Sequence, residues 1–279
     1  MSFKPKFAKV GNEGCDLHYW FQGKGPLLIL VPSGMGDGKQ FNNIMAQLDQ
    51  HFTVVAYDRR QASTSKNTTN KPLNPTQHCR DIIAIARSLG QNKTSIFASG
   101  AGGIIAMELA VSYPEAVDHM VIHEAPTLSV VPDSNFYLSR LLTLYNTYRI
   151  QGAQAATAAF RSMLQDRADG LPLSHPRTEN AERWWANDLL LLGMHGLDLA
   201  RIVDNKVSIA VATSENGKDS FYGRMAVEQE GILKCPRLVF PGGHQGFDSQ
   251  AKQFAQVLIE AFGMLEKKRR SSVFGLIFY

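Results

Sequence analysis

The 279-residue sequence is poor in cysteine and has no long apolar run. Its three cysteines, Cys15, Cys79 and Cys235, are far apart and show no CxxC spacing, which argues against a disulfide framework and a structural zinc site. No stretch approaches the roughly 20 apolar residues of a membrane-spanning helix. Residues 1–5 lack the apolar core of a signal peptide. We therefore expect a protein of a reducing, cytoplasmic compartment that is not an integral membrane protein.

The net charge of +4 comes entirely from one segment near the C-terminus. Residues 267–279 contain no acidic residue, and they begin with the four basic residues Lys267, Lys268, Arg269 and Arg270. The preceding residues carry equal numbers of basic and acidic side chains, so a basic face for nucleic acid is not expected. We expect residues 267–279 to form a basic, then apolar, C-terminal tail that is solvated and mobile.

Strand-like and helix-like patterns alternate through the first half of the chain. The expected strands are 27–31, 52–57, 94–97 and 119–123, and the expected helices are 41–48, 82–89 and 102–113. Buried strands that alternate with helices indicate a parallel sheet covered on both faces.

A helical block without a convincing strand interrupts this alternation. Its expected helices are 136–148, 153–163 and a third that carries Trp184 and Trp185. Strand–helix order resumes with expected strands at 209–212 and 238–240 and expected helices at 221–232 and 251–265. The layout predicts an α/β protein with a doubly wound, mostly parallel sheet. Its core would comprise residues 1–126 and 204–266, and residues 127–203 would be an inserted helical lid.

Residues 99–103, Ser-Gly-Ala-Gly-Gly, lie between an expected strand and an expected helix. Small residues permit the sharp turn called the nucleophile elbow, which lifts a catalytic side chain above the sheet. We place the nucleophile at Ala101, which has no oxygen or sulfur for covalent acyl transfer. A glycine-rich turn that only packs a helix close to a strand would explain the same residues.

Residues 32–36, Pro-Ser-Gly-Met-Gly, follow the first buried strand. In an enzyme with a nucleophile elbow, the loop at this point donates one backbone N–H to the oxyanion hole, and the residue after the nucleophile donates the other. We therefore expect the oxyanion donors near Gly34 or Met35 and at Gly102. On its own, this segment is an ordinary glycine-rich turn.

A histidine and a carboxylate occupy two further strand ends. His244, flanked by glycines in the last strand–helix turn, is the expected general base. Glu124 ends the strand after the elbow helix and could orient that imidazole. Glu215 and Asp219, one strand later, are alternative acids. Taken singly, Glu124 is better explained as a solvated or backbone-bonded side chain than as a catalytic one.

Together these segments, in this order, resemble the α/β-hydrolase superfamily over about residues 15–265. The His-Glu-x-Pro segment at residues 123–126 is similar to that of fungal zearalenone-type lactonases and related esterases. The resemblance implies that Glu124 is the triad acid and that the lid shapes the substrate pocket. It also implies that Trp184 or Trp185 lies against an aromatic or polyketide-like substrate, although ordinary lid packing explains either indole.

Three functions fit these residues. The first is an ester or lactone hydrolase whose serine was replaced by Ala101. The second is a cofactor-free lyase, cyclase or isomerase, of the kind used in secondary-metabolite biosynthesis, with His244 and Glu124 as its acid–base pair. The third is a catalytically silent ligand-binding protein. A dinucleotide site at residues 100–105 is disfavoured, because Ile105 stands where glycine or alanine is needed.

The apolar and aromatic residues of the lid indicate a hydrophobic small molecule as substrate. The eight histidines show no HExxH or comparable ligand spacing, so no metal site is expected. Triad chemistry requires no cofactor. The sequence does not indicate the oligomeric state.

Overall fold

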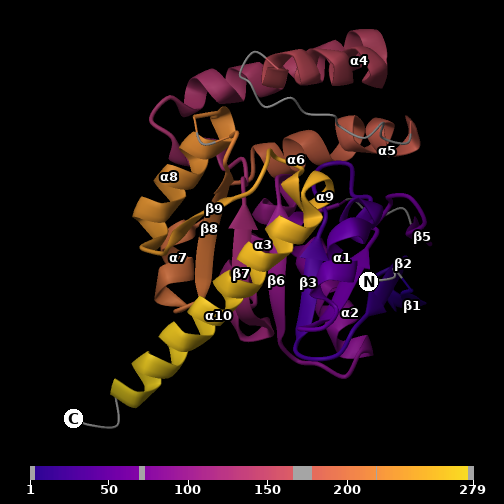
Figure 1. The fold of residues 1–279 in the computed structure, drawn as a ribbon. Coiled ribbons are helices and arrows are strands. Elements are labelled where there is room, and N and C mark those ends of the chain that lie inside the picture. Colours follow the sequence, from indigo (N-terminus) through magenta and orange to yellow (C-terminus); the bar gives the residue numbers. More distant parts are fainter. Residues whose placement is uncertain (1–3, 69–72, 166–177, 218, 276–279) are drawn as a thin grey trace.

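The computed structural model describes residues 4–68, 73–165, 178–217 and 219–275, which form an α/β fold (Figure 1). Its strands are β1 (Lys6–Asn12), β2 (Cys15–Gln22), β3 (Leu27–Val31), β4 (Thr53–Tyr57), β5 (Lys66–Asn67), β6 (Thr94–Ser99), β7 (Val117–His123), β8 (Ile209–Ser214) and β9 (Arg237–Phe240). Its α-helices are α1 (Asn42–Leu48), α2 (Pro75–Ser88), α3 (Ala101–Ser112), α4 (Ser134–Gln165), α5 (Thr178–Arg183), α6 (Leu189–Gly193), α7 (Leu199–Asp204), α8 (Phe221–Leu233), α9 (Gly246–Ser249) and α10 (Ala251–Gly275). Short 3-10 helices span Gly38–Phe41, Pro114–Ala116 and Leu128–Val130, and a π-helix spans Trp184–Asp188.

The described strands form one sheet in the order β1-β2-β4-β3-β6-β7-β8-β9, with β5 paired to β2. All neighbours from β4 through β9 are parallel, and β2 pairs antiparallel with both β1 and β4. The register places Val31 opposite Ala98 and Ser99 opposite His123. The loops after β3, β6 and β7 therefore leave the sheet at the same edge. This confirms the predicted doubly wound, mostly parallel sheet.

Alternating side chains of the central strands supply both faces of the core. Leu27, Ile29 and Val31 of β3 belong to the core cluster that includes α2 and α3, whereas Leu28 and Leu30 belong to the cluster that includes α1 and α10. Every residue of β3 is buried, as expected for a strand covered by helices on both faces. Helices thus cover both faces of the sheet. The loops at its carboxyl edge are not part of this packing and can form a binding or catalytic site.

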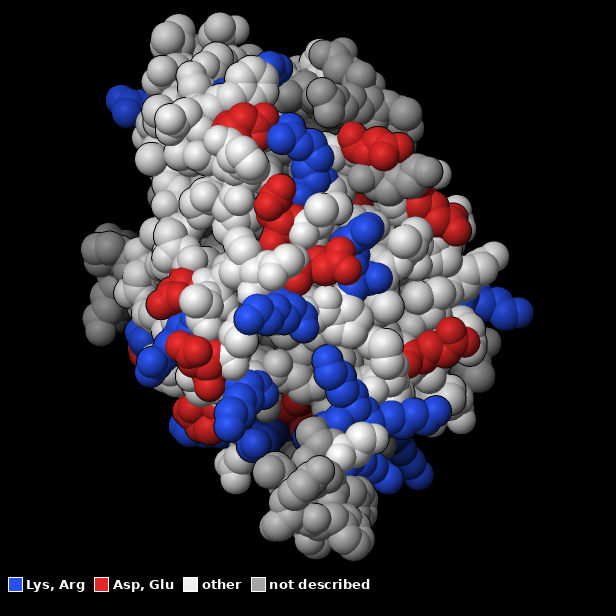
Figure 2. Space-filling view, turned by 90° about the vertical axis from the view of Figure 1, so that its left-hand side faces the viewer, with Lys and Arg blue, Asp and Glu red and all other residues white. Residues whose placement is uncertain are grey.

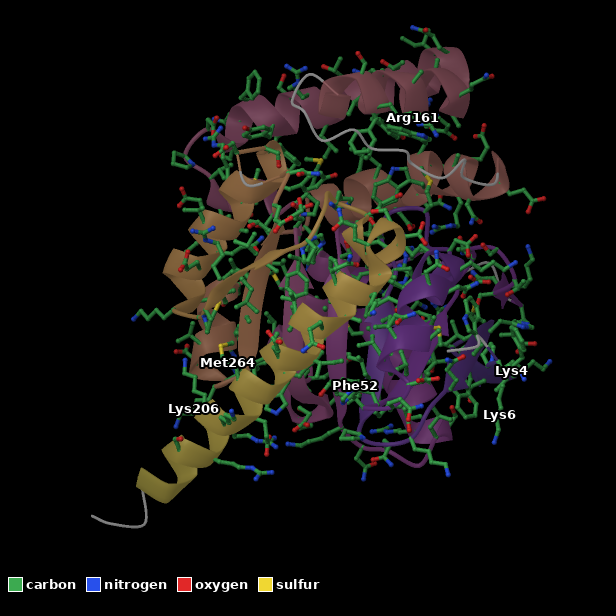
Figure 3. The ribbon with its side chains drawn as sticks, in the orientation of Figure 1. Lys4, Lys6, Phe52, Arg161, Lys206 and Met264 are labelled. Carbon is green, nitrogen blue, oxygen red and sulfur yellow. The ribbon has the colours of Figure 1, made fainter. Side chains whose placement is uncertain are left out.

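Helices α4, α5 and α6, which belong to the segment expected to form a lid and are called the lid below, lie above the sheet edge at the top of Figure 1. Phe52, which precedes β4, lies toward the opposite end of the molecule (Figure 3), so the carboxyl ends of the parallel strands face the lid. Gly152, with φ of 84° and ψ of 174°, interrupts α4 between the two helices expected there. The expected lid boundary at residue 203 falls inside α7, which packs against α3 and α8.

The expected C-terminal tail does not begin at residue 267, because α10 continues to Gly275. Within this helix Arg269 donates to Asp118 and Glu266, and Arg270 donates to Glu266 at 2.7 Å. The basic run at residues 267–270 is therefore helical and partly ion-paired. Figure 2 shows basic and acidic side chains interspersed over one face of the molecule. In the described part of the chain, no helix is long and apolar enough to cross a membrane.

The sequence interpretation missed the N-terminal hairpin of β1 and β2. Much of β1 is exposed, so its residues lack the apolar run that marked β3. Helix α2 begins at Pro75, seven residues before the expected start, with the Asn74 side chain accepting from the N–H of Gln77. Asparagine before proline is a standard helix start.

Candidate active site

Glu124 and His244 form a buried pair above the sheet edge. Nδ1 of His244 lies 2.6 Å from Oε2 of Glu124, and only 6% of the His244 residue surface is exposed. Glu124 follows the last residue of β7, and His244 lies in the turn between β9 and α9. The structure therefore brings together two residues 120 positions apart that were singled out as acid and base.

The carboxylate of Glu124 is held in its ionised form. Burial alone raises the pKa of Glu124, but the nearby His123 and His244 and the hydrogen bonds from His244 and Ser214 outweigh burial and lower it to about 2. Burial lowers the pKa of His123 to about 4, against an opposing effect of Glu124. An ionised Glu124 fixes the tautomer of His244 by accepting from Nδ1, which leaves Nε2 to accept a proton.

The imidazole of His244 is fixed by aromatic packing as well as by Glu124. Tyr222 of α8 stacks on it with ring centroids 4.5 Å apart and an interplanar angle of 15°. Behind it, His123 lies 5.9 Å away at 29°. The ring is thereby held with Nε2 directed at the nucleophile elbow.

Gly100, and not Ala101, is the tip of that elbow. Gly100 lies between Ser99, which ends β6, and Ala101, which begins α3, and has φ of 54° and ψ of −130°. A Cβ on Gly100 would lie 3.2 Å from Nε2 of His244, as expected of the nucleophile position. The prediction of Ala101 was wrong by one residue, because small residues flank both positions. The interpretation of a serine replaced by alanine at 101 falls with it.

This correction also moves one oxyanion donor from Gly102 to Ala101, the residue after the elbow tip. Ala101 begins α3, so its N–H is among those without an intrahelical acceptor. Gly102 serves close packing instead, because a Cβ there would lie 2.6 Å from the carbonyl oxygen of Val31. Gly34 and Met35 line the same cavity as Ala101 and remain candidates for the second donor.

A buried ion cluster connects the lid with the loop after β3, which is the loop expected to donate to an oxyanion hole and is called the oxyanion loop below. Nη2 of Arg59 lies 3.0 Å from Oδ2 of Asp188, which also pairs with Arg183. Arg59 donates to the carbonyl of Gly34, and Arg183 donates to that of Met35 at 3.1 Å. Burial lowers the pKa of Arg59 to about 10, against the opposing charge of Asp188. Because the two arginines hydrogen-bond the carbonyls of Gly34 and Met35, they fix the orientation of this loop relative to the cavity.

An apolar cavity of about 420 Å³ lies between this site and the lid. Its lining includes Ala101, His244, Tyr222 and residues of α4 and α6, and it is a typical size for a small-molecule site. Trp184 lines the cavity and lies against Gly34, whose Cβ would be 3.2 Å from the indole. Trp185 is fully buried inside the lid, where its Nε1 donates to Thr157 at 2.8 Å. Of the two tryptophans, only Trp184 faces the cavity.

The alternative acids lie away from the imidazole. Glu215 is exposed and its carboxylate accepts from the N–H of Gly242 at 3.4 Å, and Asp219 is exposed. His123, Glu124 and His244 have ligand atoms within 4.8 Å of one another, the only such metal-ligand grouping among the described residues. Glu124 already accepts from Ser214 and His244. The carboxylate oxygens of Glu124 are therefore already hydrogen-bonded, and these three residues fit an oriented base better than a metal site.

The sequence interpretation did not identify Tyr222, Arg183 or Asp188 as part of the site. No local motif surrounds them, because each contributes through a partner far along the chain. The contact of Arg59, in the loop after β4, with Asp188 likewise joins residues far apart in the sequence.

A family model for the alpha/beta hydrolase fold matches residues 26–187, more than half of the chain, and the chain belongs to this family. It is 24% identical over 263 residues to the uncharacterized hydrolase YraK of Bacillus subtilis, covering 92% of this chain and 95% of that protein. It is 23% identical over 256 residues to a zearalenone hydrolase of Cladophialophora bantiana, covering 89% and 93% of the two chains. A thermophilic esterase from Thermogutta terrifontis shares the fold with a TM-score of 0.73 and 17% identity, covering 93% of this chain and 99% of that one.

Proposed function

We propose that the protein hydrolyses an ester or lactone of a hydrophobic small molecule, with His244 as general base and Glu124 as the acid that orients it. The observation that carries the proposal is the 2.6 Å contact between His244 Nδ1 and Glu124 Oε2, with Nε2 facing the base of an apolar cavity. The His244–Glu124 pair alone can transfer protons. The backbone N–H groups of Ala101 and the Gly34–Met35 segment can in addition stabilise an oxyanion.

In this reaction Nε2 of His244 accepts the proton of the attacking hydroxyl group as its oxygen bonds to the acyl carbon. The N–H of Ala101 and an N–H of the Gly34–Met35 segment stabilise the negative oxygen of the tetrahedral intermediate. The imidazolium then gives its proton to the leaving alkoxide as the acyl carbon–oxygen bond breaks. Glu124 remains ionised throughout and stabilises the imidazolium.

We infer the substrate class from the lining of the cavity, and the names of two similar proteins support it. Trp184, Tyr222 and the leucines of α4 and α6 offer apolar contact area, and few polar groups reach the cavity wall from the lid. A relative is named as a zearalenone hydrolase and a structural neighbour is described as an esterase. These names favour a hydrophobic ester or lactone, with the lid excluding water around it.

One observation favours a second candidate. Gly100 gives the elbow no nucleophilic atom, so the same His244–Glu124 pair is also suited to taking a proton from the substrate itself. That chemistry would be a lyase, cyclase or isomerase reaction without net addition of water. Incorporation of ¹⁸O from labelled water into the acid product distinguishes hydrolysis from this alternative.

The test compares wild type with His244→Ala on a series of p-nitrophenyl esters with acyl chains of two to eight carbons. We expect turnover by wild type that rises with chain length and is lost in His244→Ala. Saturable binding of the esters without turnover by either form would instead identify a silent binding protein. The folded state of each variant is checked by circular dichroism.

A further inference from the structure

Ser33 and Gly100 lie at the same level of two neighbouring strands. Val31 of β3 pairs in register with Ala98 of β6, and Ser33 and Gly100 each lie two residues beyond their member of that pair. A Cβ on Gly100 would lie only 2.4 Å from Oγ of Ser33. The hydroxyl of Ser33 therefore occupies the space that a side chain at the elbow tip would need.

The same space is next to the catalytic base. The Cβ position of residue 100 that lies 2.4 Å from Ser33 Oγ also lies 3.2 Å from His244 Nε2. Ser33 lines the cavity and is half-buried, so a bound substrate can reach its hydroxyl. A serine has a single side-chain torsion before its oxygen, and rotation about it moves the hydroxyl within this space.

The backbone around Ser33 is rigid enough to position a reacting group. Its carbonyl accepts from the N–H of Gly36 at 2.8 Å, which closes a tight turn. Arg59 and Arg183 hold the next two carbonyls of the loop. The hydroxyl of Ser99, which precedes Gly100, is fully buried and lies 3.3 Å from Nδ1 of His123, outside the cavity lining.

We propose that Ser33 supplies the nucleophile that Gly100 lacks. This inference rests on the proposed function and names the hydroxyl that His244 deprotonates. Oγ of Ser33 bonds to the acyl carbon of the ester while its proton passes to Nε2 of His244. The bond to the leaving oxygen then breaks, and the imidazolium protonates that alkoxide. Water, deprotonated by His244, attacks the acyl carbon, the acyl–Oγ bond breaks, and Oγ regains a proton from His244.

The glycine at position 100 fits this assignment, because a side chain there and the Ser33 hydroxyl exclude each other at 2.4 Å. Gly100→Ser alone would place two hydroxyls in one space. The double variant Ser33→Ala with Gly100→Ser would instead leave one hydroxyl, now on the elbow. The two variants therefore separate a role specific to Ser33 from general crowding.

The experiment uses p-nitrophenyl butyrate for turnover and an alkyl fluorophosphonate as covalent probe. In the probe reaction a serine oxygen bonds to phosphorus, fluoride leaves and the proton passes to the base. Peptide mass spectrometry then locates the adduct. We expect the adduct on Ser33 in wild type, no adduct in Ser33→Ala, and a loss of at least ~10³-fold in kcat for that variant. Ser99→Ala, the matched control, should retain both labelling and turnover.

In the double variant Ser33→Ala, Gly100→Ser, the adduct should move to position 100 with partial recovery of turnover. Wild-type turnover in Ser33→Ala, or an adduct at another residue of the wild type, would overturn the assignment while leaving His244 as base. Turnover that is unaffected by His244→Ala would overturn the proposed function itself. Labelling is read independently of rate, so a loss of turnover from misfolding is not mistaken for support.

Discussion

Ser214 donates twice to one oxygen of Glu124, from its N–H at 2.8 Å and from its hydroxyl at 2.5 Å. The other carboxylate oxygen faces His244. Ser214 ends β8, the strand beside β7, so the acid at the end of one strand is held by the end of the next. These hydrogen bonds fix the orientation of the Glu124 carboxylate and stabilise its ionised form.

Glu124→Gln should lower kcat/KM for p-nitrophenyl butyrate by ~10²–10⁴-fold, because a neutral amide cannot stabilise the imidazolium of His244. Glu215→Gln and Asp219→Asn are matched controls, since both carboxylates are exposed and away from the imidazole. Steady-state kinetics at pH 7 measure the effect. A comparable loss in either control would show that the acid has been misassigned.

The two neighbouring tryptophans should respond differently to truncation. Trp184→Ala removes a cavity wall and should raise KM for a long-chain ester. Trp185→Ala removes a fully buried indole and should lower the free energy of unfolding by about 3–5 kcal/mol. Kinetics and urea denaturation of both variants give the comparison. Equal KM values for Trp184→Ala and wild type would contradict the placement of substrate.

Asp188→Asn should destabilise the fold, because it leaves Arg59 and Arg183 buried without a compensating charge. Loss of one partner from a buried ion pair typically costs about 3–5 kcal/mol. Asp133→Asn, which breaks the exposed pair with Arg224, is the control and should change stability little. Urea denaturation measures both. A small effect at Asp188 would mean that the lid and the oxyanion loop are held mainly by other contacts.

Stability should fall as the pH drops below 6.5, in part through His78. Burial, and then the charge of Arg59, lower the pKa of His78 from 6.5 to about 3. The unfolded state therefore takes up a proton between pH 6.5 and pH 3 while the folded state does not, so stability present above pH 6.5 is lost as the pH falls. His78→Leu should lose about 2 kcal/mol less than wild type between pH 8 and pH 5. Urea denaturation at both pH values decides this.

Periodicity predicted the central sheet well because β3, β4, β6, β7 and β8 are buried apolar strands. It missed β1 and β2, since a partly exposed antiparallel hairpin presents no such run. Residues 267–279 predict a mobile extension because a basic run without acidic neighbours precedes an apolar end. The ion pair of Arg269 with Asp118 depends on how α10 crosses the sheet, which sequence alone does not show. The pairs of Arg269 and Arg270 with Glu266 lie within the helix, at spacings of three and four residues.

The sequence predicted which loops form the site, but it did not predict which residue lies at the tip of the elbow. His244 and Glu124 were identifiable because glycines or a proline mark their loops. The elbow was misplaced by one residue, because glycine and alanine have equally small side chains and only the backbone angles at Gly100 distinguish them. Ser33 lies in a different loop from the elbow and far from it in sequence. Its proximity to Gly100 follows from strand pairing, which a single sequence does not reveal.

In the proposed reaction, the residue at the elbow tip and the residue that carries the nucleophile are different, whereas one serine ordinarily fills both roles. At this strand end the chain retains the turn and its amide, yet it contributes only main-chain atoms to the chemistry. Searches keyed to a serine between two small residues would classify such a protein as inactive. Comparison of side chains at equal height on adjacent strands would instead keep it among the candidates for enzymes.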